Sequence, residues 1–528
     1  MKTLIKNGMV IDGTGRPGFY GELALDGECI ESVGGAFNQA GFDQVIDAKG
    51  KVVVPGFIDT HSHSAVEALS HPCIEYKIRQ GVTTEVIGQD GISTAPLPRK
   101  HLAAWRKNLI GFDGDSDKID WDFASVHEYL KIMEEGGVGL NEAYLVPHGN
   151  LRAAVLGLDN RKAMPADVSH MQAELIEGLE AGAFGISTGL IYAPCVFADA
   201  VELINLCKVV AKYNGVFAVH QRSEANDVLS SMREVLAIGR KSSVKVHFSH
   251  FKLCGRKNWH LMEGMLKLLD EARAEGIQVS FDQYPYVAGS TILSAVLPPW
   301  VHEGGVDKLL TRLTSSQLRR QMIQDIENGL PGWDNFIDFA GFEQIFITSV
   351  ASEQNQDLIG KNLVEIGQMR GKEVYEAIFD LLYEESNAVG MVDFYGDEYH
   401  IKQFLQRPEQ NVCTDGIYGE TPHPRLFGAF PRILGKYVRE EKTLSLEAAI
   451  AKMTGKPAET FGIERRGKLR AGYFADIVIF DAATVADKGT FAKPKVYPVG
   501  IEQVFVNGRQ VVQHGVYHTC FAGKVLRK

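Results

Sequence analysis

The sequence predicts an α/β fold: a (β/α)8 TIM-type barrel joined to a small β-sandwich domain that both chain termini form. Short apolar, β-branched segments alternate with helical patterns through the middle of the chain, which is typical of βα units and a parallel sheet. Short strands with Asn-Gly and Asp-Gly turns occupy both ends. At 528 residues the chain is also too long for one ordinary domain, although α/β barrels often exceed that size.

The barrel is predicted from eight strand-like segments with helical patterns between most of them. The expected strands lie near 52–59, 83–88, 142–147, 183–187, 216–219, 244–249, 277–282 and 409–414. The clearest helical patterns cover 168–181, 199–213, 226–240 and 258–275. Eight such units predict a (β/α)8 barrel.

The domain limits follow from the same pattern. We expect residues 1–54 and 456–528 to form the composite β-sandwich domain and residues 55–455 to form the barrel. The gap between the last two predicted strands is too long for one crossover connection. Residues from about 287 to 345 are therefore predicted to form an inserted subdomain near the barrel mouth.

Net charge and hydropathy narrow the possible partners. The formal net charge of −11 argues against nucleic acid or an anionic membrane as the main partner. The N-terminal segment 1–8 lacks the apolar stretch of a signal peptide, and no window resembles a membrane span. We expect a cytoplasmic enzyme with a small-molecule substrate, and the edges of a β-domain are compatible with a homo-oligomer.

Two histidines follow the first predicted strand of the barrel. His61 and His63 are two residues apart, so on a strand their side chains point to the same face. Two imidazoles at the carboxyl end of a strand can hold a divalent metal ion. The alternative is that two surface histidines fell close together, but the apolar strand before them favours the metal site.

Polar side chains also follow most of the other predicted strands, at the end of the barrel where chemistry is expected. They include Asp90, His148, His220, His250, Asp282 and Asp415. A single histidine at a strand end is more often structural, and Asp-Gly is most often a turn. Taken together, they predict one or two metal ions. Imidazole and carboxylate ligands suit zinc, with manganese, iron and cobalt as alternatives.

Several longer segments carry a family resemblance over nearly the whole chain. They are Pro55–His63, Gly81–Thr84, Gly91–Ser93, Ser187–Pro194, His220–Glu224, His250–Lys252, Tyr284–Thr291, Asp415-Gly416 and Pro422–Arg425. In this order and spacing they resemble the amidohydrolase superfamily and, within it, the N-acyl-D-amino-acid deacylases (D-aminoacylases). The resemblance also implies the two-ended β-sandwich.

The resemblance implies the metal ligands and the catalytic base. His220 and His250 are expected to hold the tighter zinc ion, and His61, His63 and Asp415 a second, weaker or empty site. Asp415 is expected to act as the catalytic base as well. In the deacylases a metal-binding cysteine precedes the Gly-Ile-Ser segment, whereas this chain has Asp90 there. A carboxylate is harder and more anionic than a thiolate, so metal identity and number stay open.

Recognition of a substrate carboxylate requires cations and hydrogen-bond donors. Arg425 offers a planar, bidentate guanidinium. By resemblance, Lys252, Tyr192, Tyr284 and Ser290 are the other candidates. The structural alternatives are a surface salt bridge for Arg425 and core packing for the tyrosines and Ser290.

The predicted activity is hydrolysis of N-acyl-D-amino acids to a carboxylate and a free D-amino acid. One alternative is a cyclic-amide hydrolase of the hydantoinase or dihydroorotase kind. Such relatives use a carbamylated lysine at the end of strand four, where this chain has Thr188 and Tyr192. The other alternative, a non-catalytic barrel scaffold, is disfavoured because the expected metal ligands are all present.

Overall fold

Parallel β-strands occupy the middle of the chain in this computed structural model, which describes residues 1–519 and 521–528. Within the described residues, three strands pair in the order β6–β7–β8 and six in the order β17–β13–β12–β11–β10–β9. Their bounds are β6 Phe57–Asp59, β7 Val82–Ile87, β8 Asn141–Tyr144, β9 Val146–Pro147, β10 Gly185–Gly189, β11 Val216–His220, β12 Lys245–Phe248, β13 Val279–Gln283 and β17 Gln410–Val412. A parallel bridge between Ser62 and Gly416 links the segments that follow β6 and β17.

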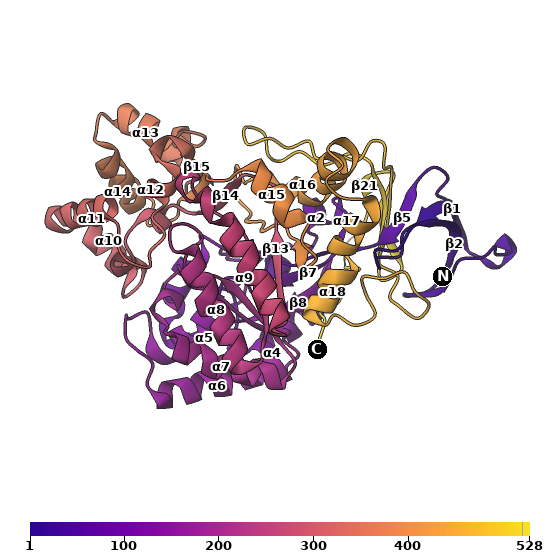
Figure 1. Cartoon of the computed structure of the whole chain (residues 1–528), viewed down its shortest axis with the longest axis horizontal. Coiled ribbons are helices and arrows are strands. Elements are labelled where there is room, and N and C mark those ends of the chain that lie inside the picture. The colour runs from indigo at the N-terminus through magenta and orange to yellow at the C-terminus, as the bar shows by residue number, and fades with distance from the viewer. Residues whose placement is uncertain (520) are drawn as a thin grey trace.

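Helices separate most successive parallel strands, β8 and β9 being the exception, and cover them (Figure 1). The long ones are α6 Pro165–Glu180, α7 Ala200–Lys212, α8 Val228–Ser242 and α9 Met262–Ala274. Each buries an apolar stripe in one hydrophobic core shared with the strands. The predicted alternation of strands and helices is therefore confirmed, and it sends the carboxyl ends of the strands to one edge.

The two ends of the chain share a sheet. Among the described residues it has nine strands, in the order β21–β20–β19–β18–β5–β1–β2–β3, with β4 beside β1. Their bounds are β1 Lys2–Val10, β2 Phe19–Asp26, β3 Cys29–Val33, β4 Gln44–Asp47, β5 Val52–Pro55, β18 Ile477–Phe480, β19 Ile501–Val506, β20 Arg509–Gln513 and β21 Val516–Tyr517. The chain ends meet where β5 and β18 pair antiparallel, with Val53 opposite Ile479. Figure 1 shows these strands together at one end of the molecule.

A second group of elements follows β13 and has its own hydrophobic core. Its sheet has the order β14–β16–β15, and β16 lies beyond the range predicted for the insertion. The bounds are β14 Ala288–Ile292, α10 Val306–Leu313, α11 Ser316–Asn328, α12 Phe336–Ala340, β15 Ile345–Ser349, α13 Leu363–Arg370, α14 Val374–Glu384 and β16 Gly390–Phe394. In Figure 1 its helices project from the parallel strands, away from the terminal sheet.

The remaining α-helices lie between successive parallel strands or between the last parallel strand, the insertion and the terminal sheet. They are α1 Glu67–Ser70, α2 Glu75–Ile78, α3 Leu102–Leu109, α4 Val126–Gly136, α5 His148–Leu156, α15 Glu398–Leu405, α16 Arg425–Arg432, α17 Leu446–Met453 and α18 Gly455–Phe461. In the part of the chain that the structure describes, no helix combines the length and apolar character needed to cross a membrane.

Candidate metal centre and active site

His61 and His63 lie directly after β6, and both side chains are buried. Their Nε2 atoms are 3.3 Å apart, so the two rings face one point. Asp113 contacts the other nitrogen of His63, with Oδ1 3.3 Å from Nδ1. The chain therefore brings the two histidines of the first barrel strand together, as their spacing predicted.

Asp415 reaches the same point from the segment after β17. Its Oδ1 atom lies 3.6 Å from His61 Nε2 and 3.4 Å from His63 Nε2. Its backbone N–H donates to the carbonyl oxygen of His61 at 2.9 Å. The segments that follow β6 and β17 thus hold these three side chains together by direct main-chain pairing.

Asp90 lies at the centre of the cluster, in the loop that follows β7. Its carboxylate oxygens are 3.7 Å from His61 Nε2, 3.6 Å from His63 Nε2 and 3.6 Å from His250 Nε2. One of them also lies 3.9 Å from His220 Nδ1. A single carboxylate in contact with four imidazoles is suited to bridge two metal ions.

His220 and His250 complete the cluster from the ends of β11 and β12. Their ring centroids are 4.4 Å apart. Both side chains are buried, yet neither nitrogen of His220 has a hydrogen-bond partner in the described structure. The same holds for His61 Nδ1 and Asp90 Oδ1. Buried polar atoms without partners are costly, and a metal ion that these atoms coordinate removes that cost.

Backbone conformation also distinguishes three of these residues. Asp90, His250 and Asp415 have φ angles of 53°, 36° and 49°, in the left-handed region. Non-glycine residues adopt this region rarely, and such strain concentrates at functional sites. These three residues therefore adopt an unfavourable backbone conformation, which directs their side chains toward one point.

Ligand atoms of the described residues form three overlapping groups, each within 4.8 Å. The groups are His61, Asp90 and His250; His61, His63 and Asp415; and His220, Glu224 and His250. The structure thus brings all six predicted ligands together. The sequence reasoning missed Glu224, although it lies four residues after His220, a spacing that could have signalled it. The Glu224 carboxylate is also bound by Lys252 Nζ, with two contacts of 2.8 Å.

The electrostatics of the cluster favour a cation. Burial alone would raise the pKa of Asp90, but the neighbouring His61 and His250 hold it well below its usual range. Burial and Lys252 oppose protonation of His250, whereas Glu224 and Asp90 raise its pKa to about 9. The carboxylates thus create a negative site that a divalent cation can neutralise.

The predicted substrate-binding side chains lie around the same point. Lys252, Tyr192, Tyr284, Ser290 and Arg425 line a cavity together with Asp415 and most of the cluster. Buried Arg425 contacts Asp415 Oδ2 through Nη1 at 2.8 Å and donates from Nη2 to the Ser290 carbonyl at 3.2 Å.

The two tyrosines have fixed hydroxyl groups. Tyr192 Oη lies 3.0 Å from Thr291 Oγ1, and Tyr284 Oη lies 2.5 Å from Tyr395 Oη. The inserted elements also add Asp393 to the cavity, a residue that the sequence reasoning did not single out. Strand β16 contributes it, and the cavity is therefore shared between the parallel strands and the inserted sheet.

Sequence comparisons identify the family to which the chain belongs. The profile of the amidohydrolase family matches residues 44–238 and 409–512. D-aminoacylase of Alcaligenes xylosoxydans xylosoxydans is 35% identical over 526 residues, which are 99% of this chain and 97% of that one. The chain belongs to the amidohydrolase family. The N-acyl-D-glutamate deacylase of the same organism is 36% identical over 96% of this chain and 92% of its own.

Solved amidohydrolase structures share the fold. The crystal structure of D-aminoacylase matches with a TM-score of 0.83 and 34% identity, covering 100% of this chain and 99% of that one. N-acyl-D-glutamate deacylase from Bordetella bronchiseptica, complexed with zinc and a phosphonate inhibitor, matches over the same shares with a TM-score of 0.82 and 33% identity. L-Hydantoinase from Arthrobacter aurescens, at 13% identity and a TM-score of 0.58, shares only the fold.

Proposed function

We propose that this amidohydrolase hydrolyses N-acyl-D-amino acids to a carboxylate and a free D-amino acid. The observation that carries the proposal is the buried cluster of four histidines and two aspartates beside a cavity that holds Arg425 and Lys252. Whole-length identity of about 35% to deacylases of these substrates supports it. The cyclic-amide alternative has weaker support, because likeness to hydantoinases is confined to the fold.

We propose zinc as the metal, with His220, His250 and Asp90 as ligands of one ion. His61, His63 and Asp415 would hold a second ion. The unpartnered nitrogens of His220 and the unpartnered Asp90 oxygen support this assignment. When bound, the metal supplies Lewis acidity at the scissile carbonyl and lowers the pKa of a water molecule.

The proposed catalytic base is Asp415. Burial opposes its ionisation, but Arg425 and His61 hold its pKa far below the usual range, so the carboxylate is ionised at neutral pH. It accepts a proton from the attacking water and then delivers it to the leaving amine nitrogen. Arg425, Lys252, Tyr192, Tyr284 and Ser290 are the proposed partners of the substrate's α-carboxylate and amide.

The proposed domain organisation follows the sheets. Residues 1–54 and 456–528 form the β-sandwich domain, which the shared sheet of both chain ends supports. Residues 55–455 form a closed barrel, supported by the bridge between Ser62 and Gly416. The inserted subdomain begins near residue 287 and supplies part of the cavity wall.

Replacement of the base tests the proposed mechanism. Asp415→Asn keeps the shape of the side chain but cannot accept the proton, so we expect kcat for N-acetyl-D-methionine to fall at least about 100-fold. Metal content and circular dichroism of the zinc-loaded variant serve as controls for site and fold. A near-normal kcat would remove Asp415 from the role of base.

A further inference from the structure

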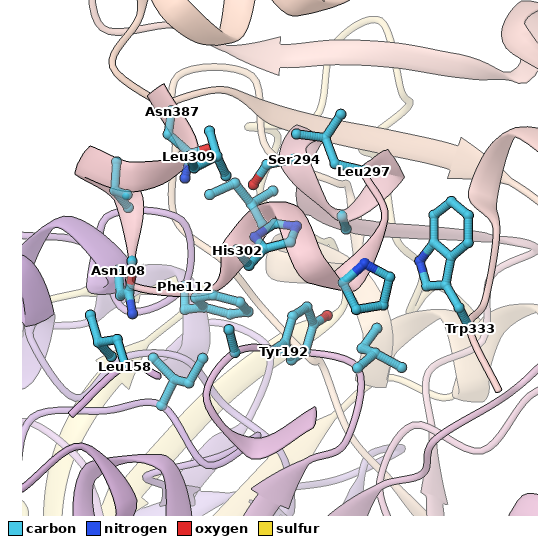
Figure 2. A pocket seen from close by; sticks show the side chains of 18 of the residues that line it. Asn108, Phe112, Leu158, Tyr192, Ser294, Leu297, His302, Leu309, Trp333 and Asn387 are labelled. Atoms are coloured by element: carbon cyan, nitrogen blue, oxygen red, sulfur yellow. The ribbon is translucent and has the colours of Figure 1, made fainter. Parts of the chain in front are cut away.

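A second cavity adjoins the metal centre on the side of the inserted subdomain. It lies between the segments that connect the parallel strands and the inserted elements. In Figure 2, Phe112, Leu158 and Tyr192 face Leu297 and Leu309 of the insertion across this space. We refer to this space as the apolar chamber: apolar residues make up most of its wall, and Asn108, Ser294 and Asn387 add polar groups.

The apolar chamber shares part of its wall with the metal cavity. Phe112, Ile191, Tyr192, Asp334 and Phe336 line both spaces. Two of the shared rings also contact metal-centre histidines. The Phe112 ring centroid lies 6.1 Å from that of His63, and the Tyr192 ring lies 5.2 Å from that of His220. One aromatic side chain, Phe112 or Tyr192, therefore separates the chamber from the nearest proposed metal ligands.

The two spaces differ in charge. Arg425 and Lys252 line the metal cavity and do not line the chamber. The chamber does contain the side chains of His302 and Asp334. Burial lowers the pKa of His302 to about 4, so its imidazole is neutral at physiological pH, and burial raises the pKa of Asp334 to about 7. The α-carboxylate of a substrate thus belongs in the metal cavity, and its apolar part belongs in the chamber.

We propose that the apolar chamber binds the acyl group and that the substrates are N-acyl-D-amino acids with a medium-chain fatty acyl group. This inference rests on the proposed deacylase function. With the scissile carbonyl at the metal centre and the α-carboxylate toward Arg425 and Tyr284, the acyl chain extends past Phe112 and Tyr192. The chamber extends from Phe112 and Tyr192 to Leu297 and Leu309, so its apolar wall can contact an acyl chain of several methylenes.

A binding experiment tests the chamber without requiring turnover. Zinc-loaded Asp415→Asn protein is titrated calorimetrically with N-octanoyl-D-methionine and N-acetyl-D-methionine. We expect the octanoyl compound to bind at least about tenfold tighter, because its additional methylenes leave water. Equal affinities would overturn the proposal.

Matched tryptophan substitutions then locate the bound chain. Ala295→Trp fills the chamber from the insertion, and Leu158→Trp fills it from the opposite wall. Ala103→Trp is the control, because Ala103 is exposed on α3 and does not line the chamber. We expect each chamber variant to weaken octanoyl binding at least about tenfold more than acetyl binding, whereas the control preserves the preference. A preference that survives both chamber substitutions would mean that the chain binds elsewhere and would overturn the proposal.

Kinetics separate this inference from the proposed function. For wild-type enzyme, kcat/KM should rise at least about tenfold from N-acetyl- to N-octanoyl-D-methionine, and Ala295→Trp should abolish most of that rise. If the octanoyl compound binds in the chamber but neither substrate turns over, the deacylase function fails and the apolar subsite stands. If N-acetyl substrate turns over as fast as N-octanoyl substrate, the deacylase function stands and the chamber assignment fails.

Discussion

Arg425 Nη1 lies 2.8 Å from Asp415 Oδ2, and both side chains are buried. The other oxygen of the same carboxylate faces His63 Nε2 at 3.4 Å. Asp415 is thus held between a guanidinium and the metal-centre histidines. The sequence predicted Arg425 as a partner of the substrate carboxylate, and its contact with Asp415 gives it a second effect, on the orientation and charge of the proposed base.

We predict that Arg425→Ala lowers kcat at least about tenfold in addition to raising KM. The substitution removes the guanidinium that orients Asp415 and keeps it ionised. The variant therefore loses transition-state stabilisation as well as substrate binding. The matched control is Arg432→Ala, because Arg432 lies on the same helix but pairs with Asp487 outside the cavity. Steady-state kinetics with N-acetyl-D-methionine check this, and a change in KM alone would limit Arg425 to carboxylate binding.

We predict that Asp90→Ala lowers zinc affinity at least about tenfold, since Asp90 contacts four of the proposed histidine ligands. Asp90→Cys should restore zinc binding and shift preference toward softer metals, because a thiolate replaces a carboxylate. Equilibrium dialysis with zinc and manganese measures both effects. Unchanged zinc affinity in Asp90→Ala would exclude Asp90 from the metal centre.

A buried lysine beneath the metal centre gives a stability prediction. Lys77 Nζ bonds Asp59, Ser62 and Thr414 and lies 3.4 Å from Glu85 Oε2. Lys77→Met leaves these buried carboxylates without their cation, so we expect the free energy of unfolding to fall by about 3 to 5 kcal/mol.

The control for this prediction is a surface ion pair. Arg240 and Glu275 are both about half exposed, and Arg240→Ala should cost less than about 1 kcal/mol. Urea denaturation of both variants gives the comparison. If Lys77→Met lowers the free energy of unfolding as little as Arg240→Ala does, the Lys77 network does not contribute to stability.

His148 gives a pH-dependent prediction. Its Nε2 lies 2.8 Å from Glu202 Oε1 and its Nδ1 2.9 Å from Thr188 Oγ1. Burial opposes protonation, but Cys195 and Glu202 raise its pKa from 6.5 to about 9. Because the folded pKa is the higher one, this stabilisation is complete below about pH 6.5 and is lost as pH rises through about 9.

The corresponding measurement is denaturant unfolding of wild type and His148→Gln at pH 6 and pH 9. We expect the stability difference between the two proteins to shrink by roughly 3 kcal/mol over this interval, the free energy equivalent of the pKa shift. A pH-independent difference would show that His148 is not protonated in the folded protein.

Much of the fold was predictable because local patterns encode it. The strand expected at 216–219 is β11 Val216–His220, and the helix expected at 199–213 is α7 Ala200–Lys212. The clustering of the candidate metal ligands was predictable for the same reason, since each follows a recognisable apolar strand and parallel strands end at one edge. The helix expected at 258–275 begins later as an α-helix, at Met262, because a 3-10 helix precedes it.

Other features depend on contacts between distant segments, which no local pattern shows. Lys77 lies in the short helix α2 and reads as an ordinary surface lysine, but it is fully buried against Asp59 and Glu85. The apolar chamber forms only where segments as distant as Leu158 and Leu309 meet. The sequence pattern also gives no sign that Asp393 on β16 reaches the metal cavity.

The most direct test of the account is hydrolysis of paired D and L substrates, N-acetyl- and N-octanoyl-methionine, by zinc-loaded and chelator-treated protein. We predict turnover of the D enantiomers by the zinc-loaded protein, with no turnover of the L enantiomers and none after chelation. Zinc-loaded protein that hydrolyses neither enantiomer, or that hydrolyses L substrates equally well, would contradict the central claim.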